Sequence, residues 1–301
     1  MKEKIITVIG SLNYDIIIKQ QRLPLKGETY TADSIAFASG GKGANQAVQA
    51  AKLGAPTYLV GQVGSDSFGN FLVDELTKYQ VKLDYLERSA STTGMGIVHA
   101  LDDGSVYATI TMGANGDVTP EQIDRIEPLI KRSEILILQL EIPIPTIEYV
   151  IEVGKRHGCQ IILNAAPAVA ISDKALEQID FLIVNEPEAS FYCEADIHDF
   201  DSAQANYQKL YTHFKGVLVI TLGAQGSFLY DQKNVYHIPT QKVPVIETTG
   251  AGDSYIGAFA CALLQGKSVY DAALFGTSAA EITVTRIGAQ SSMPDRNELN
   301  I

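Results

Sequence analysis

Short apolar runs alternate with stretches of helical periodicity along most of the chain. The runs that fit buried strands lie at residues 5–9, 58–63, 135–140, 161–163, 181–184 and 217–221. The spacing typical of an amphipathic helix occurs at residues 44–53, 67–79, 146–157, 202–214 and 255–264. This alternation of strand and helix predicts a parallel sheet covered by helices.

Two stretches break this rhythm, at residues 14–38 and 92–113, because neither contains a helical pattern. The second reads as two strands joined at Asp102-Asp103-Gly104-Ser105, whose composition is typical of a hairpin turn. The sequence contains no internal repeat, low-complexity segment or linker. It therefore predicts one folding unit over residues 1–301, with two excursions from its core.

Composition narrows the class of protein. The 301 residues are 46% hydrophobic and 19% charged, which allows a large buried core. No apolar run approaches the roughly 18 residues that span a bilayer, and the first residues lack a signal-peptide pattern. Cys159, Cys193 and Cys261 lack the spacing of a zinc site, and their small, odd number indicates no disulfides. The net charge of −12 argues against nonspecific nucleic-acid binding. We expect a cytoplasmic protein without membrane or nucleic-acid partners.

The segment Glu247–Ser254 is the most informative in the chain. Gly250 and Gly252 let the backbone approach a ligand where a helix begins. The N–H groups of a first helical turn lack partners within the helix and carry the positive end of its dipole, so phosphate oxygens fit there. Asp253 lies in the same turn, where it suits either a helix cap or a base for a substrate hydroxyl. Taken alone, the segment is explained equally well as a capped helix.

A second glycine cluster, Ser39–Ala47, also leads into a predicted helix. Here too the backbone can lie against something small and polar. The cluster is not a Walker loop, because glycine and not Ser or Thr follows Lys42. A near-miss for that loop at Gly266-Lys267-Ser268 falls at the end of a helical pattern, and we interpret it as a helix C-cap.

Further motifs follow in a fixed order. They are Gly10–Asp15, Gln139–Glu141, Asn185–Glu188, Thr221–Gly226 and Thr285–Gln290. Together with the two glycine clusters, these segments resemble the signatures of the ribokinase-like (PfkB) carbohydrate kinases over essentially the whole chain. Several segments in the right order are far more specific than any one of them.

The resemblance implies a fold and an activity. The implied fold is a three-layer α/β/α sandwich with a mainly parallel central sheet, and the two excursions form a small β-sheet lid. The implied reaction transfers the γ-phosphoryl group of ATP to the primary hydroxyl of a pentose, with D-ribose giving ribose 5-phosphate as the first choice. ATP is the co-substrate, Mg²⁺ accompanies it, K⁺ activates, and the expected assembly is a homodimer through the lid.

The resemblance also assigns roles to residues near the reacting groups. Asp253 is implied as the catalytic base, and the amides of Gly250, Ala251 and Gly252 as the anion hole. The residues implied in sugar binding are Asn13, Asp15, Gly40, Gly41, Lys42, Asn45, Glu141 and Asp253.

Simpler interpretations of these polar residues stay open. Asn13 and Asp15 also suit an Asx turn after the first strand, and Glu141 suits a strand end before Pro143. Lys42 suits a solvated lysine without a catalytic role.

A third group concerns the nucleotide. The residues implied in binding it are Asn185, Glu188, Thr221, Gly223, Gly226, Gly252 and Thr277. Glu188 is implied in addition as an indirect contact of Mg²⁺. Without the resemblance, Asn185 and Glu188 read as the cap of a helix that follows a strand.

A monovalent-cation site is implied next to the anion hole. The matching positions for K⁺ are Glu247, Thr249, Thr283, Arg286, Gly288 and Ser292. The family usually has aspartate where this chain has Glu247. Glutamate keeps the charge but is one methylene longer, and a large cation among oxygen ligands tolerates such a shift better than Mg²⁺. We therefore expect activation by K⁺ to persist.

Two other functions remain possible on the sequence. One is a kinase of the same fold acting on deoxyribose, fructose, a ketodeoxy sugar acid or a nucleoside. The other is a non-catalytic protein that binds a sugar or nucleotide. Asp253 beside an intact anion loop argues against the second, because a pure binder gains nothing from a base there.

Overall fold

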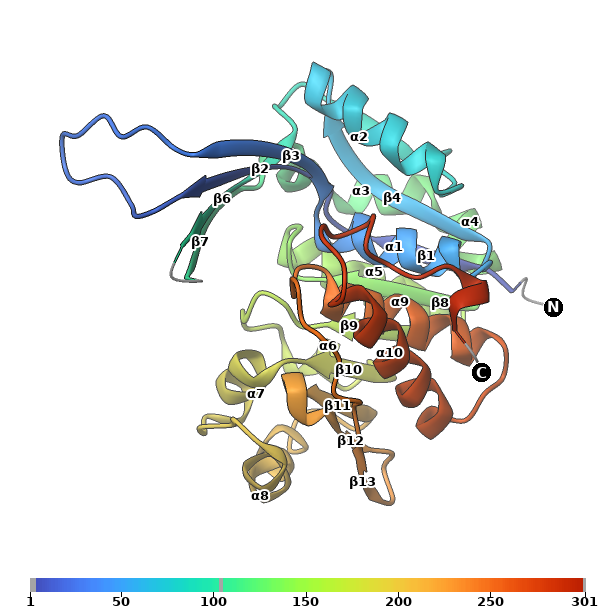
Figure 1. The fold of residues 1–301 in the computed structure, drawn as a ribbon. Coiled ribbons are helices and arrows are strands. Elements are labelled where there is room, and N and C mark those ends of the chain that lie inside the picture. The colour runs from blue at the N-terminus through green and yellow to red at the C-terminus, as the bar shows by residue number, and fades with distance from the viewer. Residues whose placement is uncertain (1–3, 103–104, 300–301) are drawn as a thin grey trace.

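A nine-stranded sheet forms the centre of the molecule. The structure is a computed structural model that describes residues 4–102 and 105–299 (Figure 1). In spatial order the strands are β13 (Val235–Ile238), β12 (Ser227–Tyr230), β11 (Val217–Thr221), β10 (Phe181–Val184), β9 (Gln160–Asn164), β8 (Ile135–Gln139), β1 (Ile6–Ile9), β4 (Thr57–Gly64) and β5 (Leu86–Ser89). Within this sheet, every pair of neighbours from β11 across to β5 is parallel, and only β12 and β13 pair antiparallel. The prediction of a mainly parallel sheet is confirmed.

Helices cover both faces of this sheet (Figure 1). One layer consists of α1 (Lys42–Lys52), α2 (Ser67–Lys78), α9 (Ala251–Leu264) and α10 (Val269–Thr283). The other consists of α3 (Pro120–Arg125), α4 (Glu127–Arg132), α5 (Ile144–Arg156), α6 (Asp173–Leu176), α7 (Glu186–Cys193) and α8 (Phe200–Leu210). Three 3₁₀ turns complete the described chain, namely η1 (Gly113–Asp117), η2 (Gly223–Gln225) and η3 (Arg296–Glu298). The three-layer α/β/α arrangement matches the prediction.

Burial on both faces explains why the central strands read as continuous apolar runs. In β8, Ile135 and Ile137 pack into the core shared with α1 and α9, whereas Leu136 and Leu138 pack into the core shared with α5. All four side chains are fully buried. Successive strand residues point to opposite faces, so a strand between two helical layers has no polar face.

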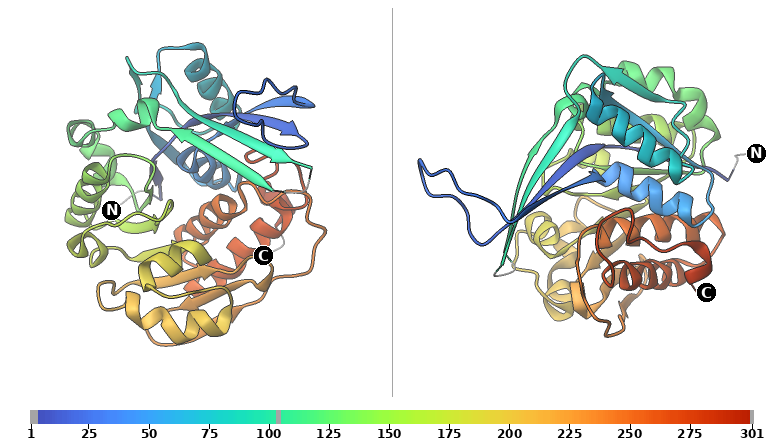
Figure 2. Two further views of the ribbon diagram at one scale, coloured as in Figure 1. Left: turned by 90° about the vertical axis from the view of Figure 1, so that its left-hand side faces the viewer. Right: turned by 45° about the horizontal axis from the view of Figure 1, so that its top comes forward.

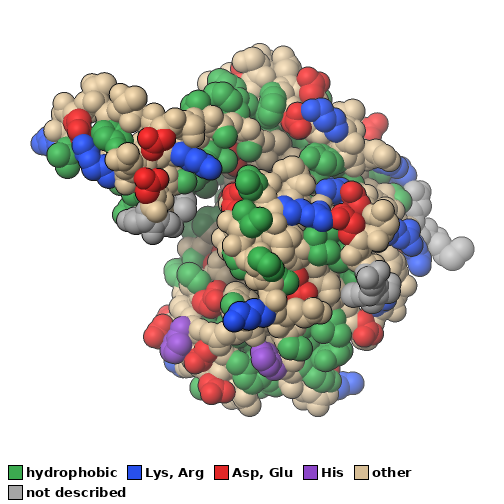
Figure 3. Space-filling view, in the orientation of Figure 1, with side chains coloured by type: hydrophobic (Ala, Val, Ile, Leu, Met, Phe, Trp, Pro, Cys, Tyr) green, Lys and Arg blue, Asp and Glu red, His purple; other side chains and the backbone are tan. Residues whose placement is uncertain are grey.

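A second, four-stranded sheet projects from the body as a lid (Figures 1 and 2). Its spatial order is β3 (Ser34–Gly40), β2 (Asn13–Gln20), β6 (Gly94–Leu101) and β7 (Val106–Thr111). The strands come from both predicted excursions. The predicted turn at 102–105 includes residues 103 and 104, which lie outside the described residues. In the space-filling view the lid stands clear of the body, with a recess beneath it (Figure 3).

The five helices and six strands expected from periodicity are present with small shifts of their ends. The last predicted helix begins earlier than expected, at Ala251, and Gly266 follows it with φ +82°, as expected of a C-cap glycine. The interpretation of 266–268 as a helix end is therefore confirmed. No helix in the described part of the chain is both long and apolar enough to cross a membrane.

Candidate active site at the carboxyl ends of the strands

The predicted polar residues gather at one edge of the large sheet. Glu141 follows β8, Asn185 follows β10, and Thr221 ends β11. Asn13, which begins β2, follows β1 closely in the chain. In a parallel sheet, segments that leave the strands at the same edge converge there, which is where open α/β sheets bind ligands. The topology therefore brings sequence-distant segments to one place.

The start of α9 presents unpaired backbone donors. Gly250 precedes the helix in the left-handed region, with φ +77°. Within the described residues, the N–H groups of Gly250, Gly252 and Asp253 have no protein acceptor. The expected contribution of Ala251 to the anion hole is contradicted, because its N–H bonds to the carbonyl of Thr248 at 3.2 Å. A Cβ added to Gly252 would meet nothing within 4 Å, so the space in front of this turn is open. Free amides and a helix dipole suit an anion.

The start of α1 is closed by the protein itself. The N–H groups of Lys42 and Gly43 lie 3.3 Å from Glu141 Oε2 and 3.4 Å from Ser11 Oγ, and that of Ala44 lies 2.9 Å from the Ser11 carbonyl. These amides already have acceptors. The second glycine cluster therefore does not repeat the anion site of the first.

Lys42 lies among carboxylates. Its Nζ is 3.9 Å from Glu141 Oε1, and 34% of its side chain is exposed. Burial lowers the pKa of Lys42, but nearby negative charges outweigh this effect and raise the pKa above its ordinary value. In decreasing order of effect, these charges belong to Asp253, Glu141, Glu188 and Asp15. Lys42 is thus the central counter-charge of an acidic site, and the interpretation as a merely solvated lysine is wrong.

Asp15 has an unusual carboxyl group. Burial raises its pKa to about 7, helped by the charges of Glu141 and Asp253 and opposed by Lys42. Gly40 and Gly96 on the flanking strands leave room for it, since a Cβ on either would collide with one of its carboxylate oxygens. Asp15 and Asn13 both lie in β2 and not in an Asx turn.

Asn13 is held by a residue that the sequence did not indicate. Asn115 in η1 donates from Nδ2 to Asn13 Oδ1 at 2.8 Å and to the carbonyl of Leu12 at 3.1 Å. Its own Oδ1 accepts from the N–H of Leu12 at 2.9 Å. Because Asn13 Oδ1 accepts this bond, the NH₂ group of Asn13 remains as a donor, and Asn13 lies on the same face of β2 as Asp15.

Asp253 is bonded by two neighbouring amides of α1. Asn45 Nδ2 donates to Oδ2 and Gln46 Nε2 donates to Oδ1, both at 2.9 Å. Burial raises the pKa of Asp253 above its usual range, and Lys42 and these two hydrogen bonds oppose that rise. A carboxylate with a raised pKa is a stronger base than an exposed one.

Asn185 and Glu188 form the cap of α7. The Asn185 side chain accepts from the N–H of Glu188 at 3.0 Å, and Glu188 Oε2 accepts from the N–H of Asn185 at 2.9 Å. This reciprocal capping box is the simpler of the two interpretations made from the sequence. Burial raises the pKa of Glu188, and its other oxygen remains available to a ligand.

The other predicted nucleotide residues form a separate group. Thr221 Oγ1 donates to the carbonyl of Val184 at 3.3 Å, which joins the ends of β10 and β11. Gly223 begins η2 and Gly226 follows it, with φ +51° and +85°, values that favour glycine. Thr277 Oγ1 donates to the carbonyl of Ala273 within α10. No hydrogen bond among the described residues joins this group to Asp253.

The predicted cation residues lie around the start of α9 and the end of α10: Glu247 and Thr249 precede α9, Thr283 ends α10, and Arg286, Gly288 and Ser292 follow α10. Glu247 Oε2 accepts from the N–H of Gly288 at 2.9 Å, so the longer side chain folds back onto the tail. Thr283 and Ser292 bond their hydroxyls to backbone carbonyls one turn away. The guanidinium of Arg286 pairs with Glu298. Because it is positively charged and has no acceptor atom, only the backbone carbonyl of Arg286 could contact a cation. No group of three or more His, Cys, Asp or Glu side chains in the described chain forms a metal cluster.

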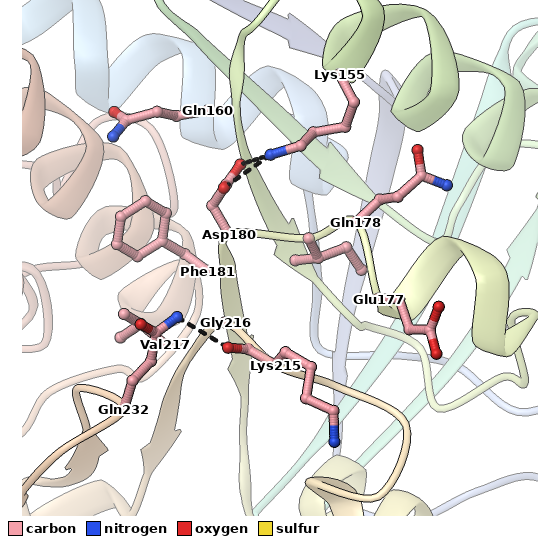
Figure 4. Close-up of a pocket in the computed structure, with 11 residues that line it drawn as sticks. Lys155, Gln160, Glu177, Gln178, Asp180, Phe181, Lys215, Gly216, Val217 and Gln232 are labelled. Carbon is pink, nitrogen blue, oxygen red and sulfur yellow. Dashed lines mark hydrogen bonds and ion pairs between the residues drawn. The ribbon is translucent and has the colours of Figure 1, made fainter.

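A pocket of about 330 Å³ lies at the opposite edge of the sheet (Figure 4). It is lined where β9, β10 and β11 begin, and it contains none of the predicted site residues. Lys155 pairs with Asp180 at 2.8 Å, and Gln232 donates to the carbonyl of Lys215 at 2.8 Å. Lys155 and Asp180 neutralise each other, whereas no ion pair joins Glu177 or the Lys215 ammonium to the other residues drawn. Because the pocket contains none of the predicted site residues, the candidate active site is at the carboxyl edge.

Comparisons with known proteins agree with this geometry. The sequence profile of the pfkB family carbohydrate kinases matches residues 3–296. A ribokinase of Haemophilus influenzae is 36% identical over 298 residues, which covers 98% of this chain and 97% of the relative. A deoxyribokinase of Salmonella typhi is 33% identical, with the same coverage. The structure of Arabidopsis thaliana ribokinase complexed with ribose and ATP has a TM-score of 0.92 at 34% identity, and the match covers 98% of this chain and 96% of that one. The chain belongs to the pfkB family of carbohydrate kinases.

Sequence reasoning missed the buried amides of the site. Four amide side chains are almost fully buried, although they are polar. They belong to Gln46, Gln139, Gln290 and Asn115, which lie inside glycine-rich or apolar segments. That placement was the available signal, because a buried amide needs hydrogen-bond partners and so marks a polar network.

Proposed function

We propose that the protein is an ATP-dependent kinase that transfers the γ-phosphoryl group to the primary hydroxyl of D-ribose, giving ribose 5-phosphate. The observation that carries this proposal is the position of the Asp253 carboxylate in the same helical turn as the free amides of Gly252 and Asp253, at the start of α9. Ribokinase relatives over nearly the full chain, and the likeness to a ribokinase bound to ribose and ATP, support ribose as the substrate.

The residues divide the chemistry between them. Phosphoryl transfer needs alignment of the hydroxyl, compensation of developing charge and exclusion of water. Asp253 accepts the hydroxyl proton, while the amides of Gly252 and Asp253 face the negative oxygens. Lys42 adds a positive charge near the base Asp253 and near the acidic residues Asp15 and Glu141. Asn13, Asp15, Asn45 and Glu141 provide the donors and acceptors for the sugar hydroxyls.

Two ions fit the residues present. Mg²⁺ is held mainly by nucleotide phosphates and water, so the single buried carboxylate of Glu188 is a sufficient protein partner, and the ion would offset phosphate charge. K⁺ needs several oxygens at relaxed distances, and Glu247 keeps one carboxylate oxygen free of the bond to Gly288. Backbone carbonyls of the tail would complete the K⁺ set and help to order the turn that carries the amides.

The test is an ADP-release assay with ATP and Mg²⁺ over a panel of sugars and nucleosides. We expect D-ribose to give the highest kcat/KM. Asp15→Ala should raise the ribose KM strongly and leave the ATP KM nearly unchanged, because the sugar hydroxyls lose the hydrogen-bond partner that the Asp15 carboxyl provides. A nucleoside or hexose preferred by about tenfold or more would reject ribose as the substrate while leaving the kinase class intact.

Deoxyribose is the second candidate, because a deoxyribokinase aligns with this chain at 33% identity. The two sugars differ only in the 2-hydroxyl group. A site built to bond that hydroxyl loses affinity for the sugar without it, since its polar partners stay unpaired. Side-by-side kcat/KM values for ribose and 2-deoxyribose therefore decide between the two functions.

A homodimer through the lid is the proposed assembly. Strand alternation places Ile35 and Phe37 of β3, Ile97 of β6 and Tyr107 of β7 on the lid face opposite to Asp15. These four side chains are 37–57% exposed, which is unusual for large apolar residues on one face. Phe37→Asp should convert a dimer to a monomer in light scattering. A wild-type monomer at micromolar concentration would reject the assembly.

A further inference from the structure

The bonds to Asp253 are backed by a second layer of buried amides. Behind Asn45, Gln290 Nε2 donates to Asn45 Oδ1 at 3.0 Å. Behind Gln46, Gln139 Nε2 donates to Gln46 Oε1 at 2.6 Å. The chain of donors runs from Gln290 through Asn45 to Asp253 on one side, and from Gln139 through Gln46 to Asp253 on the other.

This second layer fixes which way the inner amides point. An amide side chain can rotate by half a turn and exchange its donor for its acceptor. With Gln290 and Gln139 donating to the two carbonyl oxygens, only the NH₂ groups of Asn45 and Gln46 can face Asp253. Gln46 is further fixed by Asn164, whose Oδ1 accepts from the same NH₂ group at 3.2 Å.

Packing alone does not explain these residues. Gln46 and Gln139 are fully buried, and Gln290 is 4% exposed. In the described chain, Oε1 of Gln139 and Oε1 of Gln290 are buried without a hydrogen-bond partner. Each unpaired buried carbonyl costs stability that an apolar side chain would not lose. The donors of Gln139 and Gln290 are therefore the reason to keep amides at these positions.

We infer that Gln46, Gln139 and Gln290 are positioning residues for the base, which hold both oxygens of Asp253 as hydrogen-bond acceptors aimed at the substrate hydroxyl. The inference rests on the proposed function and extends it to residues that touch no substrate. Amides suit this task because they donate without carrying a charge or a transferable proton. Gln290 lies in the segment after α10, so it also connects that segment to the base through Asn45.

The test compares two substitutions of Gln46 in the full-length enzyme. Gln46→Met removes the donor at similar volume, and Gln46→Glu replaces it with an acceptor that becomes negative. Under conditions where chemistry limits the rate, both should lower kcat about 10- to 100-fold, the effect expected of a misaligned group, with the ribose KM within about threefold. The pH at which kcat falls to half on the acid side should rise by roughly one unit, and further for Gln46→Glu, because the charged form of Asp253 loses a bond or gains a like charge.

The matched control is Gln122→Met. Gln122 is also fully buried, and it bonds to Gln62 and to the carbonyl of Gly61, away from Asp253. It should lower the melting temperature to a similar extent without moving the acid limb of the kcat profile. Gln290→Met tests the same claim one bond further from the base, with a smaller loss of kcat and a shift in the same direction.

The outcomes separate this inference from the proposed function. A wild-type enzyme without sugar kinase activity would reject the function itself. An active wild type whose Gln46 and Gln290 variants keep the wild-type acid limb, or lose only ribose affinity, would overturn the positioning role. If the Gln46 variants do not fold, the Gln290→Met profile against the Gln122→Met profile decides the matter by the same criterion.

Discussion

The starts of α1 and α9 are both glycine-rich in sequence, but their backbone amides differ in whether the protein itself already binds them. At α9, the amides of Gly252 and Asp253 lack protein acceptors, and nothing stands in front of Gly252. At α1, Ser11 and Glu141 take the corresponding amides, and a Cβ on Gly43 would lie 2.6 Å from the N atom of Ser11. Glycine thus serves ligand access at α9 and close backbone packing at α1.

The difference shows that a glycine-rich turn before a helix defines no function by itself. What decides is whether other segments of the chain already use the amides. At α1 the functional groups are side chains, namely Lys42, Asn45 and Gln46, which point to the acids around the sugar and the base. At α9 the functional groups are the backbone and a single carboxylate.

The largest effect should come from the carboxylate of α9. Asp253→Asn keeps the shape but removes the base, so turnover should fall roughly 10²–10⁴-fold, with sugar and ATP binding nearly unchanged. Steady-state kinetics check this. Asp180→Asn is the control, because that carboxylate lies at the other edge of the sheet (Figure 4), and its kcat should stay within about threefold of wild type. Equal kcat values for the two variants would remove Asp253 from the mechanism.

A pair of glycine substitutions tests directly whether glycine serves backbone packing at α1 and ligand access at α9. Gly43→Ala forces a methyl group against the backbone of Gly10 and Ser11, and overpacking of this kind costs about 1–3 kcal/mol. Gly252→Ala meets no protein atom, so its melting temperature should not fall, but the methyl group should hinder the phosphoryl group and lower kcat/KM for ATP about tenfold or more. Thermal unfolding and kinetics of both variants check the pair. The account is wrong if Gly252→Ala loses stability and keeps its activity.

The central strands and the helices between them were predictable, because the hydrophobic pattern that identifies each element lies within its own residues. The apolar run at β8 and the amphipathic pattern of α5 each identify their own element. Helix α10 was missed because most of its residues are small or apolar, including the buried Ala272, Phe275 and Ala279, so no clear polar stripe reveals the helical period.

The site was predictable only in part. Its motifs located Asp253 and Asp15, but the closure of α1 and the amide network depend on tertiary contacts. Gln290 and Asn45 are 245 residues apart, and Asn45 and Asp253 are 208 apart. No local pattern records such pairs.

A smaller effect should appear in the pH dependence of the folding stability, through the carboxyl group of Asp15. The Asp15 carboxyl has its pKa raised to about 7 from 3.8, so the folded protein holds this proton more tightly than the unfolded chain does. The stability from that proton is present at low pH and is lost as the pH rises through about 7. Asp15→Asn cannot ionise, so it should raise the melting temperature at pH 8, by roughly 2 °C or more, and by less at pH 5. Equal shifts at the two pH values would contradict the raised pKa.

The smallest effect should come from the turn before α9. Potassium should raise the rate modestly at constant ionic strength, set with a tetraalkylammonium salt, because the ion orders the turn that carries the free amides. Glu247→Gln should need more K⁺ for half-maximal activation, since the coordinating oxygen loses its charge. A rate that does not respond to KCl would show that Glu247 abolishes or replaces the ion site.

The central claim is that the backbone amides at the start of α9, and not those at the start of α1, bind the oxygens of the phosphoryl group during its transfer. Amide NMR spectra of the deuterated enzyme with ribose test it most directly, recorded before and after addition of ADP, Mg²⁺ and aluminium fluoride as a mimic of that group. The account predicts large shifts for the amides of Gly252 and Asp253 and small shifts for those of Gly43 and Ala44. Unmoved signals from Gly252 and Asp253, with large shifts at Gly43 and Ala44, would contradict it.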